Sequence, residues 1–414
     1  MQIKSIAVEN FKALRASGTV RLKPLSIIIG NNGSGKSSLM EAAETYVRVI
    51  TSGVDAAMEH WQGFEHVRHK AAQSQQTSTA TLANQPHAMK FSLNVKVEDA
   101  AAKLRLDVNT FNQGNLLYIQ REFYQKGVDF VERTAGSIST GVHNSSGLQP
   151  DVERALKILD GGKSLLPSLS LFDKVTQALR NMLFLRLNPD TIGQLQSVKR
   201  SERRIQLASD GANVAEYLID LRERSPSAFE EVSHALRYVL PYASDVEPKV
   251  LDAGVLRRSY VQLLESRYEI PGWLMSSGSL RVLPLIATLL DPDPPSVIFI
   301  EEVENGLDPR TVGLVVDLMR AATQSGRTQV VATTHSPYLL DMLDLDDVLL
   351  CERGPKGPGF SWPASRNEMK AWRDRFMPGK LYTMSALQHE PHALVADDDP
   401  QEGEAPELGW GEDE

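Results

Sequence analysis

The stretch Gly30–Ser37, which reads GNNGSGKS, decides the fold of this chain. It matches the pattern G-x-x-x-x-G-K-[ST] in full, and this pattern is typical of loops that bind nucleotide phosphates. Glycines let the backbone curl so that successive N–H groups point at phosphate oxygens, while the lysine reaches the terminal phosphates and the hydroxyl ligates Mg²⁺. The residues predicted to bind a nucleotide here are Gly30, Asn31, Asn32, Gly33, Ser34, Gly35, Lys36, Ser37 and Ser38, with Ser37 also a magnesium ligand.

The segments on either side of this loop support the same prediction. Leu25–Ile29 is a short apolar run that is typical of a buried strand. Behind the loop, apolar residues recur at helical spacing, namely Leu39, Met40, Ala43, Val47 and Ile50. The order of strand, glycine-rich loop and helix places the positive end of a helix dipole against the phosphates.

A second candidate element is Ser296–Glu302, which reads SVIFIEE. Its apolar residues predict a buried strand, and the carboxyl ends of parallel strands meet at one edge of a sheet. The two acidic residues that end the strand would therefore lie beside the bound phosphates. We expect Glu301 to hold Mg²⁺ through water, and Glu302 to act as the general base that polarises the attacking water.

The first part of the chain predicts an antiparallel sheet and two loops. Three stretches alternate between apolar and polar residues, over Met89–Val97, Leu104–Phe111 and Leu116–Phe123. Two stretches of low complexity, Ala71–Met89 and Ala135–Pro150, are expected to be surface loops.

The second part of the chain begins with helical periodicity, which runs from Leu165 to about Arg237. Helices are expected over Ser170–Leu185 and Asn213–Glu223. After Pro271 the pattern of strands and helices returns, with a helix over Thr311–Thr323 and a second buried strand over Thr328–Thr334.

Beyond Glu301 the chain resembles one class of ATPase. Residues Glu301–Pro309 read EEVENGLDP and are similar to the Walker B motif and D-loop of the ATP-binding-cassette (ABC) class, whose pattern is Asp-Glu-Pro-x-Ser-x-Leu-Asp-Pro. The strand over Thr328–Thr334 leads into His335, which matches the switch histidine of that class. The resemblance implies that Asp308 lies at the nucleotide and that His335 contacts the γ-phosphate.

Met275–Arg281, which reads MSSGSLR, resembles a degenerate form of the signature motif of the same class. In that motif a serine side chain and glycine N–H groups, at a helix N-terminus, bind the γ-phosphate of the nucleotide on the other subunit. The resemblance implies these roles for Ser276 and Gly278, and with them a head-to-tail homodimer that encloses two ATP molecules. The alternative for Ser276 is an ordinary helix N-cap.

Most of the chain from Met1 to about Arg353 resembles the RecF/OLD-like ATPases, which are relatives of SMC-type heads rather than of transporters. Stretches over 10–39, 207–221, 276–290, 301–309 and 334–343 carry the resemblance. Glu301 and Val303 replace the Asp and the Pro of the ABC pattern. Asp308 stands where RecF/OLD-like ATPases often have His. The Q-loop glutamine is not assigned, and each of its candidates is alternatively a polar strand residue; they are Gln113, Gln120 and Gln125.

This resemblance implies an α/β fold, an ABC-ATPase head built from both ends of the chain, with ATP and Mg²⁺ as cofactors. We expect a β-rich lobe with the phosphate loop over residues 1–164 and a mainly helical insertion over 165–270. A second lobe over 271–390 would carry the signature, the Walker B motif, the D-loop and the switch histidine. An acidic tail over 391–414 is expected to be disordered.

The charge and composition of the chain argue against several classes of protein. The 414 residues include 44 basic and 53 acidic ones, and the net charge of −9 equals the nine acids of Pro391–Glu414, which has no Lys or Arg. The rest of the chain is balanced, so it lacks the strongly basic composition of many nucleic-acid-binding domains. With one cysteine, Cys351, and no apolar run near ~18 residues, we expect a cytoplasmic protein that neither spans a membrane nor contains an internal disulfide.

A nuclease active site is not expected. OLD nucleases carry a metal-binding TOPRIM domain after the ATPase, whereas 79 residues follow His335. We interpret Asp397–Asp399 as part of a solvated tail rather than as a metal cluster.

The sequence contains two weaker candidate clusters. Four basic residues could contact a nucleic-acid backbone, although a solvated face is favoured; they are Lys199, Arg200, Arg203 and Arg204. Three histidines lie close in sequence without nearby cysteines, so metal binding is not expected there; they are His60, His66 and His69.

Three roles stay open at this level. The protein could be a sensor and scaffold ATPase that controls a separate effector such as a nuclease, as relatives in phage-defence operons do. It could instead be a RecF-type ATPase that binds DNA in repair, or a structural subunit that binds ATP without hydrolysing it. Glu302 and His335 argue against the structural subunit, and the neutral body and missing nuclease favour the first role over the second. An oligomer larger than the dimer is also left open.

Overall fold

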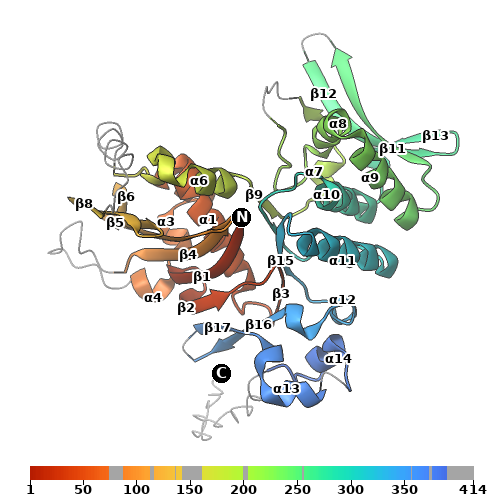
Figure 1. The fold of residues 1–414 in the computed structure, drawn as a ribbon. Coiled ribbons are helices and arrows are strands. Elements are labelled where there is room, and N and C mark those ends of the chain that lie inside the picture. The colour runs from red at the N-terminus through yellow and green to blue at the C-terminus, as the bar shows by residue number, and fades with distance from the viewer. Residues whose placement is uncertain are drawn as a thin grey trace, which may run out of the picture.

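The computed structural model describes residues 1–73, 87–111, 116–135, 137–141, 161–198, 204–253, 256–355, 357–372 and 375–388. The described residues form a central, mainly parallel sheet between two hydrophobic cores. An antiparallel sheet covers one core and a group of helices covers the other (Figure 1). None of the described helices is long and apolar enough to cross a membrane.

The central sheet has six strands in the order β17-β16-β3-β15-β14-β9. Strands β16, β3, β15, β14 and β9 are parallel, and β17 is antiparallel to β16. The strands are β3 (Leu25–Ile29), β9 (Met182–Leu185), β14 (Val297–Ile300), β15 (Gln329–Thr333), β16 (Val348–Gly354) and β17 (Gly357–Ser361). The strands predicted before the glycine-rich loop, before the acidic pair and before His335 are therefore confirmed.

Side chains of the central strands alternate between the two cores. Ile28 belongs to the core under the antiparallel sheet, whereas Ile27 and Ile29 belong to the core under the helices. Successive residues of a strand point to opposite faces, and a parallel sheet is buried on both of them. This explains why the strands of this sheet appear in the sequence as continuous apolar runs.

The antiparallel sheet has seven strands in the order β2-β1-β4-β5-β6-β7-β8. They are β1 (Gln2–Phe11), β2 (Leu14–Arg21), β4 (Met89–Val97), β5 (Ala100–Phe111), β6 (Leu116–Lys126), β7 (Asp129–Thr134) and β8 (Ser137–Gly141). Helix α1 (Lys36–Ser52) packs between this sheet and the central one, since residues of all three share one core. Four shorter helices border the same lobe, namely α2 (Val54–His60), α3 (Phe64–Val67), α4 (Lys70–Gln73) and α6 (Asp173–Arg180).

Helices cover the other face of the central sheet. The four longest are α8 (Val214–Arg224), α9 (Pro226–Val239), α10 (Ser277–Leu290) and α11 (Pro309–Gln324). Shorter helices are α7 (Pro189–Ile192), α12 (Pro337–Leu340), α13 (Asn367–Trp372) and α14 (Pro378–Thr383). The helices expected over Asn213–Glu223 and Thr311–Thr323 correspond to α8 and α11.

The region expected to be mainly helical, residues 165–270, also contains strands that the sequence did not predict. A small antiparallel sheet of order β10-β12-β11, with β13 paired to β12, projects beside α8 and α9 (Figure 1). Its strands are β10 (Gln196–Ser197), β11 (Asp245–Ala253), β12 (Leu256–Glu265) and β13 (Tyr268–Pro271). Only a few of its apolar side chains, such as Val246, Val261 and Leu263, reach the core. With so few buried positions, its periodicity did not stand out from that of the helices around it.

The helix expected over Ser170–Leu185 is half wrong. Helix α6 ends at Arg180, and Met182–Leu185 forms β9 at the edge of the central sheet, where it pairs with β14. A four-residue apolar run cannot be assigned by periodicity alone, and the partner strand decides it.

Of the two expected loops, residues 74–86, 136 and 142–150 lie outside the described part of the chain. Ser137–Gly141, expected to be loop, forms β8 on β7. The acidic tail, 391–414, also lies outside the described residues.

Candidate active site

The loop between β3 and α1 contains three glycines in the positive-φ region, which lets the backbone curl. Gly30, Gly33 and Gly35 have positive φ angles of 144°, 72° and 115°. A Cβ atom on Gly30 would stand 2.1 Å from the carbonyl oxygen of Cys351, and one on Gly35 would stand 2.8 Å from Cγ of Pro358. Gly30 and Gly35 therefore need glycine both for their φ angles and for close packing against β16 and β17, whereas Gly33 needs it for its φ angle alone.

Lys36 lies folded against this loop. Its Nζ donates to the carbonyl oxygens of Gly30 at 2.7 Å and Asn31 at 3.1 Å. Burial lowers the pKa of Lys36, and the charge of the nearby Glu302 opposes this shift. Ser37 and Ser38 follow in the first turn of α1, where free backbone N–H groups and the helix dipole favour anions.

Two distant parts of the chain meet at a cavity of ≈ 520 Å³ beside this loop. The N-terminal part contributes Ala13, Asn32, Gly33, Gly35, Lys36, Ser37 and Ser38. The C-terminal part contributes Glu302, Thr333 and His335, from the carboxyl ends of β14 and β15. Since β3, β15 and β14 are neighbours in the sheet, three adjacent strand ends build this site.

The remaining residues of the predicted phosphate loop face a second cavity. Gly30, Asn31 and Ser34 line a space of ≈ 570 Å³ that they share with Cys351 and other residues. The Cys351 thiol is buried against the carbonyl oxygen of Ser34 at 3.3 Å, and burial raises the pKa of Cys351 to about 11. The loop therefore separates the two cavities.

Glu302 has a strained backbone. Its φ angle is 47°, in the left-handed region that residues with a side chain rarely adopt. Its backbone N–H donates to Oγ1 of Thr333 at 2.9 Å, and its Oε2 accepts from Nδ2 of Asn305 at 3.2 Å. Such strain clusters at active sites, where the surrounding structure maintains it.

His335 is held by a residue that sequence reasoning did not assign. The backbone N–H of His335 donates to Oε1 of Glu304 at 2.7 Å, and the other oxygen of Glu304 is buried. The backbone N–H of Val303 donates to the carbonyl oxygen of Thr333 at 3.1 Å. The segment after β14 thus fixes the segment after β15, and Glu304 lies inside the EEVEN stretch that already suggested a site.

Glu301 makes an ion pair that the sequence did not predict. Its Oε1 accepts from Nε of Arg186 at 2.9 Å. Burial raises the pKa of Glu301, and the charge of Arg186 opposes this shift. The only signal for Arg186 in the sequence is its place directly after the apolar run Met182–Leu185.

The side chains present fit a magnesium ion that arrives with a nucleotide. Among the residues the structure describes, no group of three or more His, Cys, Asp or Glu side chains could hold a metal by itself. Mg²⁺ in phosphate-binding sites is commonly held by one or two protein oxygens together with phosphate oxygens. The Ser37 hydroxyl, which lines the cavity, and the Glu301 carboxylate, which follows β14 but does not line it, are hard oxygen donors of this kind.

The signature-like segment lies outside the cavity of its own chain. Ser276 caps α10: its Oγ accepts from the backbone N–H of Ser279 at 3.1 Å. Ser276 is exposed, and neither it nor Gly278 lines the cavity that contains Lys36. The structure therefore does not bring Ser276 and Gly278 to the phosphate loop within one chain.

Asp308 is an N-cap residue in this structure. Its carboxylate accepts from the backbone N–H groups of Arg310 at 3.0 Å and Thr311 at 3.2 Å, and from the Thr311 hydroxyl at 2.5 Å. The hydroxyl bond from Thr311 is the main reason why the pKa of Asp308 is lowered. Asp308 does not line the cavity beside Lys36, so its predicted contact with a nucleotide stays a prediction.

Two of the three candidate Q-loop glutamines, Gln120 and Gln125, do not line this cavity. Gln120 and Gln125 lie on β6 of the antiparallel sheet, where Gln120 Oε1 accepts from Nδ2 of Asn109 at 2.8 Å and Gln125 donates to Gly127. Gln113 lies outside the described residues.

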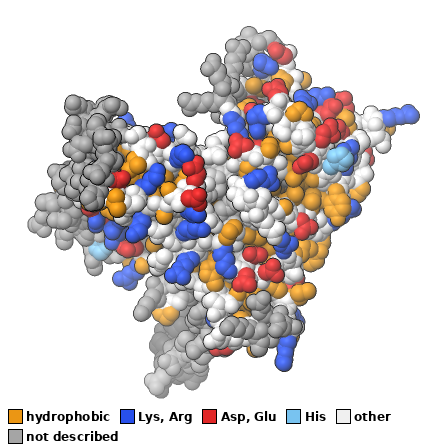
Figure 2. Space-filling view, viewed as in Figure 1, with side chains coloured by type: hydrophobic (Ala, Val, Ile, Leu, Met, Phe, Trp, Pro, Cys, Tyr) orange, Lys and Arg blue, Asp and Glu red, His pale blue; other side chains and the backbone are white. Residues whose placement is uncertain are grey.

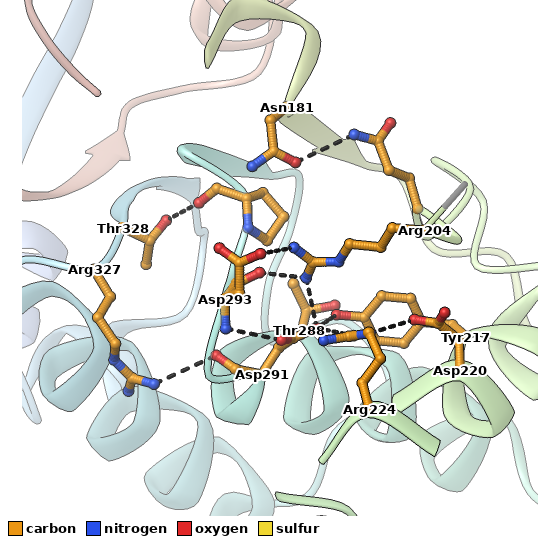
Figure 3. A network of polar contacts seen from close by, with 12 residues as sticks. Asn181, Arg204, Tyr217, Asp220, Arg224, Thr288, Asp291, Asp293, Arg327 and Thr328 are labelled. Atoms are coloured by element: carbon orange, nitrogen blue, oxygen red, sulfur yellow. Dashed lines mark hydrogen bonds and ion pairs between the residues drawn. The ribbon is translucent and has the colours of Figure 1, made fainter. Parts of the chain in front are cut away.

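Of the four clustered basic residues, the structure describes one, Arg204. Arg204 binds Asp291 and Asp293, in a network that ties α8 to the end of α10 (Figure 3). Lys199, Arg200 and Arg203 lie outside the described residues. Figure 2 shows basic side chains interspersed with acidic and uncharged ones on the face it draws.

The glycine-rich loop, the acidic end of β14 and His335 after β15 are together typical of a P-loop NTPase with an ABC-type head. The model of the family described as "AAA domain, putative AbiEii toxin, Type IV TA system" matches residues 25–341. This span is most of the sequence, and the chain belongs to that family. The matched part of the chain is an ABC-type ATPase domain.

Solved structures support the fold. An SMC head bound to the C-winged helix domain of ScpA is similar over 87% of this chain and 98% of that chain, with a TM-score of 0.55 and 12% identity. An SMC head from Pyrococcus furiosus, with an extended coiled coil and bound to the C-terminal domain of ScpA, covers 90% and 98%, with a TM-score of 0.50 and 10% identity. The predicted ATPase-head fold is confirmed.

Curated relatives share a short part of this chain. ABC transporter G family member 35 of Arabidopsis thaliana is 34% identical over 110 residues, which are 27% of this chain and 7% of that protein. ABC transporter G family member 51 of Oryza sativa subsp. japonica is 29% identical over 148 residues, 34% of this chain and 10% of that protein. The matched part spans a tenth or less of the length of these two relatives.

Proposed function

We propose that this protein is a magnesium-dependent ATPase whose two heads close around ATP and thereby control a separate effector protein. The observation that supports this most directly is the one cavity shared by Lys36, Glu302 and His335. It offers a cation for the phosphates, a carboxylate for the attacking water and an imidazole for the terminal phosphate. Phosphoryl transfer needs mainly positioning and electrostatic stabilisation of this kind.

In this proposal each side chain has one task. Lys36 and the loop N–H groups bind the β- and γ-phosphates, and His335 donates to the γ-phosphate. Glu302 orients a water and takes its proton. The water oxygen bonds to the γ-phosphorus as the bond to the β–γ bridging oxygen breaks, which releases ADP and inorganic phosphate. When bound, Mg²⁺ would neutralise phosphate charge, with Ser37 and Glu301 as its protein ligands.

The exposed signature-like segment favours a head-to-tail dimer. Ser276 and Ser277 lie at the exposed N-terminus of α10, a 14-residue helix, and outside the cavity of their own chain. A second copy that presents this helix end to the cavity would complete the site around the γ-phosphate. ATP would then hold the two heads together, and hydrolysis would release them.

The output of this cycle is proposed to be control of an effector in the cytoplasm, in phage defence, as for those RecF/OLD-like ATPases that the sequence resembles and that occur in phage-defence operons. Two observations support it. No cluster of metal-binding side chains occurs in the described part of the chain, which argues for a separate nuclease or other effector. SMC heads of similar fold have been solved with a domain of ScpA bound, so a head of this shape can dock a partner protein.

One set of assays separates this proposal from a RecF-type role in DNA repair. Phosphate release is measured with ATP, with and without Mg²⁺, and with linear and single-stranded DNA. Magnesium-dependent turnover that DNA leaves unchanged supports the effector role, whereas strong stimulation by DNA supports the repair role. Lys36→Ala should abolish turnover, and Lys90→Ala, an exposed lysine paired with Glu9, is the control. Absence of magnesium-dependent turnover in the unaltered protein would contradict both the effector role and the repair role.

A further inference from the structure

Arg186 lies at the edge of the central sheet, directly after the last residue of β9. Strand β9 runs parallel to β14 with Leu185 opposite Ile300, and the backbone N–H of Glu301 donates to the carbonyl oxygen of Leu185 at 3.0 Å. This register brings Arg186 beside Glu301. The guanidinium then makes two bonds, from Nε to Oε1 of Glu301 at 2.9 Å and from its terminal nitrogen to Oε2 of Glu44 at 2.6 Å.

Glu44 connects this pair to the phosphate loop. It belongs to α1, and Ser37, Glu41 and Glu44 follow one another at spacings of four and three residues, which places them on one face of the helix. The Glu44 side chain is 3% exposed, and its Oε1 accepts from Arg48 at 3.0 and 2.8 Å. Arg186 therefore bridges the first acid after β14 and the helix face that begins at Ser37.

We propose that Arg186 is a positioning residue for the magnesium site: its guanidinium fixes the Glu301 carboxylate relative to Ser37. The inference rests on the proposed ATPase function. It assigns to Arg186 no contact with the reacting atoms. Arg186 acts through Glu301. The orientation of the Glu301 carboxylate sets the affinity of the site for a magnesium ion that arrives with ATP.

The charges around Arg186 explain why this position needs a guanidinium. Glu301, Glu44 and Glu41 lie close enough to interact electrostatically, and Arg186 is the cation that touches two of them. Without it, Glu301 would face two like charges and lose its hydrogen bond. A lysine could pair with one carboxylate, whereas the planar fork of arginine binds both at once.

The test compares two arginines that bind the same glutamate. Arg186→Gln removes the bridge to Glu301, whereas Arg48→Gln removes a bond to Glu44 and leaves Arg186 paired with Glu301. Each variant is titrated with Mg²⁺ at saturating ATP, and thermal unfolding without nucleotide checks the fold. A second readout, which needs no turnover, is the affinity for a non-hydrolysable ATP analogue in EDTA and in Mg²⁺.

For Arg186→Gln we expect the Mg²⁺ concentration at half-maximal turnover to rise by about 10-fold or more, a typical loss when a partner of a metal ligand is removed. Binding of the analogue in EDTA should equal that of the unaltered protein, while the gain in affinity on adding Mg²⁺ should shrink. The Mg²⁺ requirement of Arg186→Lys should lie between those of the unaltered protein and Arg186→Gln. Arg48→Gln should leave the Mg²⁺ requirement unchanged.

An unchanged Mg²⁺ requirement in folded Arg186→Gln would overturn the inference. If Arg186→Gln does not fold, Arg186→Lys decides: a Mg²⁺ requirement equal to that of the unaltered protein overturns the inference, and a raised one supports it. If the unaltered protein itself shows neither magnesium-dependent turnover nor a magnesium effect on nucleotide binding, the proposed function fails instead.

Discussion

Gly278 and Gly306 are in contact: a Cβ atom on Gly278 would stand 2.6 Å from the carbonyl oxygen of Gly306. Gly278 lies in the first turn of α10, and Gly306 lies between β14 and α11 with a φ angle of 74°. Arg281 adds a hydrogen bond to the carbonyl oxygen of Asn305 at 3.1 Å. The signature-like segment and the D-loop-like segment are therefore one packed unit within the chain.

Gly278→Ala should separate these two segments. The added methyl group would force the backbone at Gly306 away, and a misplacement of about 1 Å in an active site can cost about 10²-fold in rate. We expect a large loss of ATP turnover with little change in nucleotide affinity, because Gly278 lies outside the cavity of its own chain. Gly313→Ala in α11 is the matched control, since its Cβ would lie 3.8 Å from Met342. Equal turnover in both variants would contradict this prediction.

Glu302→Gln should stop hydrolysis and preserve ATP binding. The amide keeps the shape of the side chain but cannot take a proton, and loss of a general base typically costs about 10²–10⁴-fold. The variant should accumulate as an ATP-bound dimer, measured by light scattering with and without ATP. Asp317→Asn, at an exposed acid on α11, is the control. Undiminished turnover in Glu302→Gln would remove Glu302 from its proposed role.

Two inactive variants should complement each other when mixed. Lys36→Ala damages the cavity, and Ser276→Arg damages the signature-like helix end, so either homodimer has two defective sites. A mixed dimer can place both lesions in one site and leave the other intact. Mixing under conditions that exchange subunits should therefore restore part of the ATPase activity. If exchange is demonstrated and activity does not return, completion of the site by the partner is wrong.

Asp291 should make stability depend on pH. It is fully buried, and its Oδ2 accepts from Tyr217 at 2.5 Å, Arg204 at 2.9 Å and Arg224 at 3.0 Å (Figure 3). Burial by itself raises the pKa of Asp291, but the hydrogen bonds from Arg224 and Tyr217 outweigh it, so the pKa is lowered. A lowered carboxyl pKa stabilises the fold above the unfolded value of about 4, and this stabilisation is lost as the pH falls through the folded pKa.

Asp291→Asn should therefore lower the free energy of unfolding near neutral pH. Removing one partner of a buried ion pair typically costs about 3–5 kcal/mol. Urea unfolding at neutral pH and below about pH 4 measures the effect, and the difference from the unaltered protein should shrink in acid. Asp317→Asn should show no such dependence. A difference that stays constant with pH would mean that the carboxylate charge is not what stabilises this network.

The purified protein should cleave no nucleic acid. Metal-dependent hydrolysis of a phosphodiester needs carboxylates clustered on a formed scaffold, and the described residues contain no such cluster. The assay incubates protein, ATP and Mg²⁺ or Mn²⁺ with linear, circular and single-stranded DNA and with RNA. Cleavage that disappears when Asp397, Asp398 and Asp399 are all changed to Ala would reverse this prediction.

The sequence predicted the parts of the site that depend on local spacing. The loop from Gly30 to Ser37 and the apolar strands before Glu301 and His335 are short, and their patterns point to one sheet edge. Parallel strands then bring their carboxyl ends together, so the meeting of Lys36, Glu302 and His335 followed from topology.

What the sequence did not predict depends on pairing between distant segments. Met182–Leu185 is a strand only because β14 offers it a partner, and Arg186 reaches Glu301 only through that register. The small sheet of β11 and β12 was missed because few of its side chains are buried. The cap role of Asp308 has a signal in the sequence that the sequence analysis did not use, because Asp before Pro at a helix start is a common N-cap arrangement.

The left-handed backbone of Glu302 sets two selective pressures against each other. A residue with a side chain in this conformation costs on the order of 1–3 kcal/mol, and every folded molecule carries that cost whether or not it meets ATP. Glycine would adopt the same φ of 47° without steric conflict. Selection for thermodynamic stability alone would therefore favour glycine here, whereas the proposed role of Glu302 as general base would favour the glutamate. Among descendants of this sequence that have lost the activity, position 302 should be among the first to drift toward glycine or asparagine.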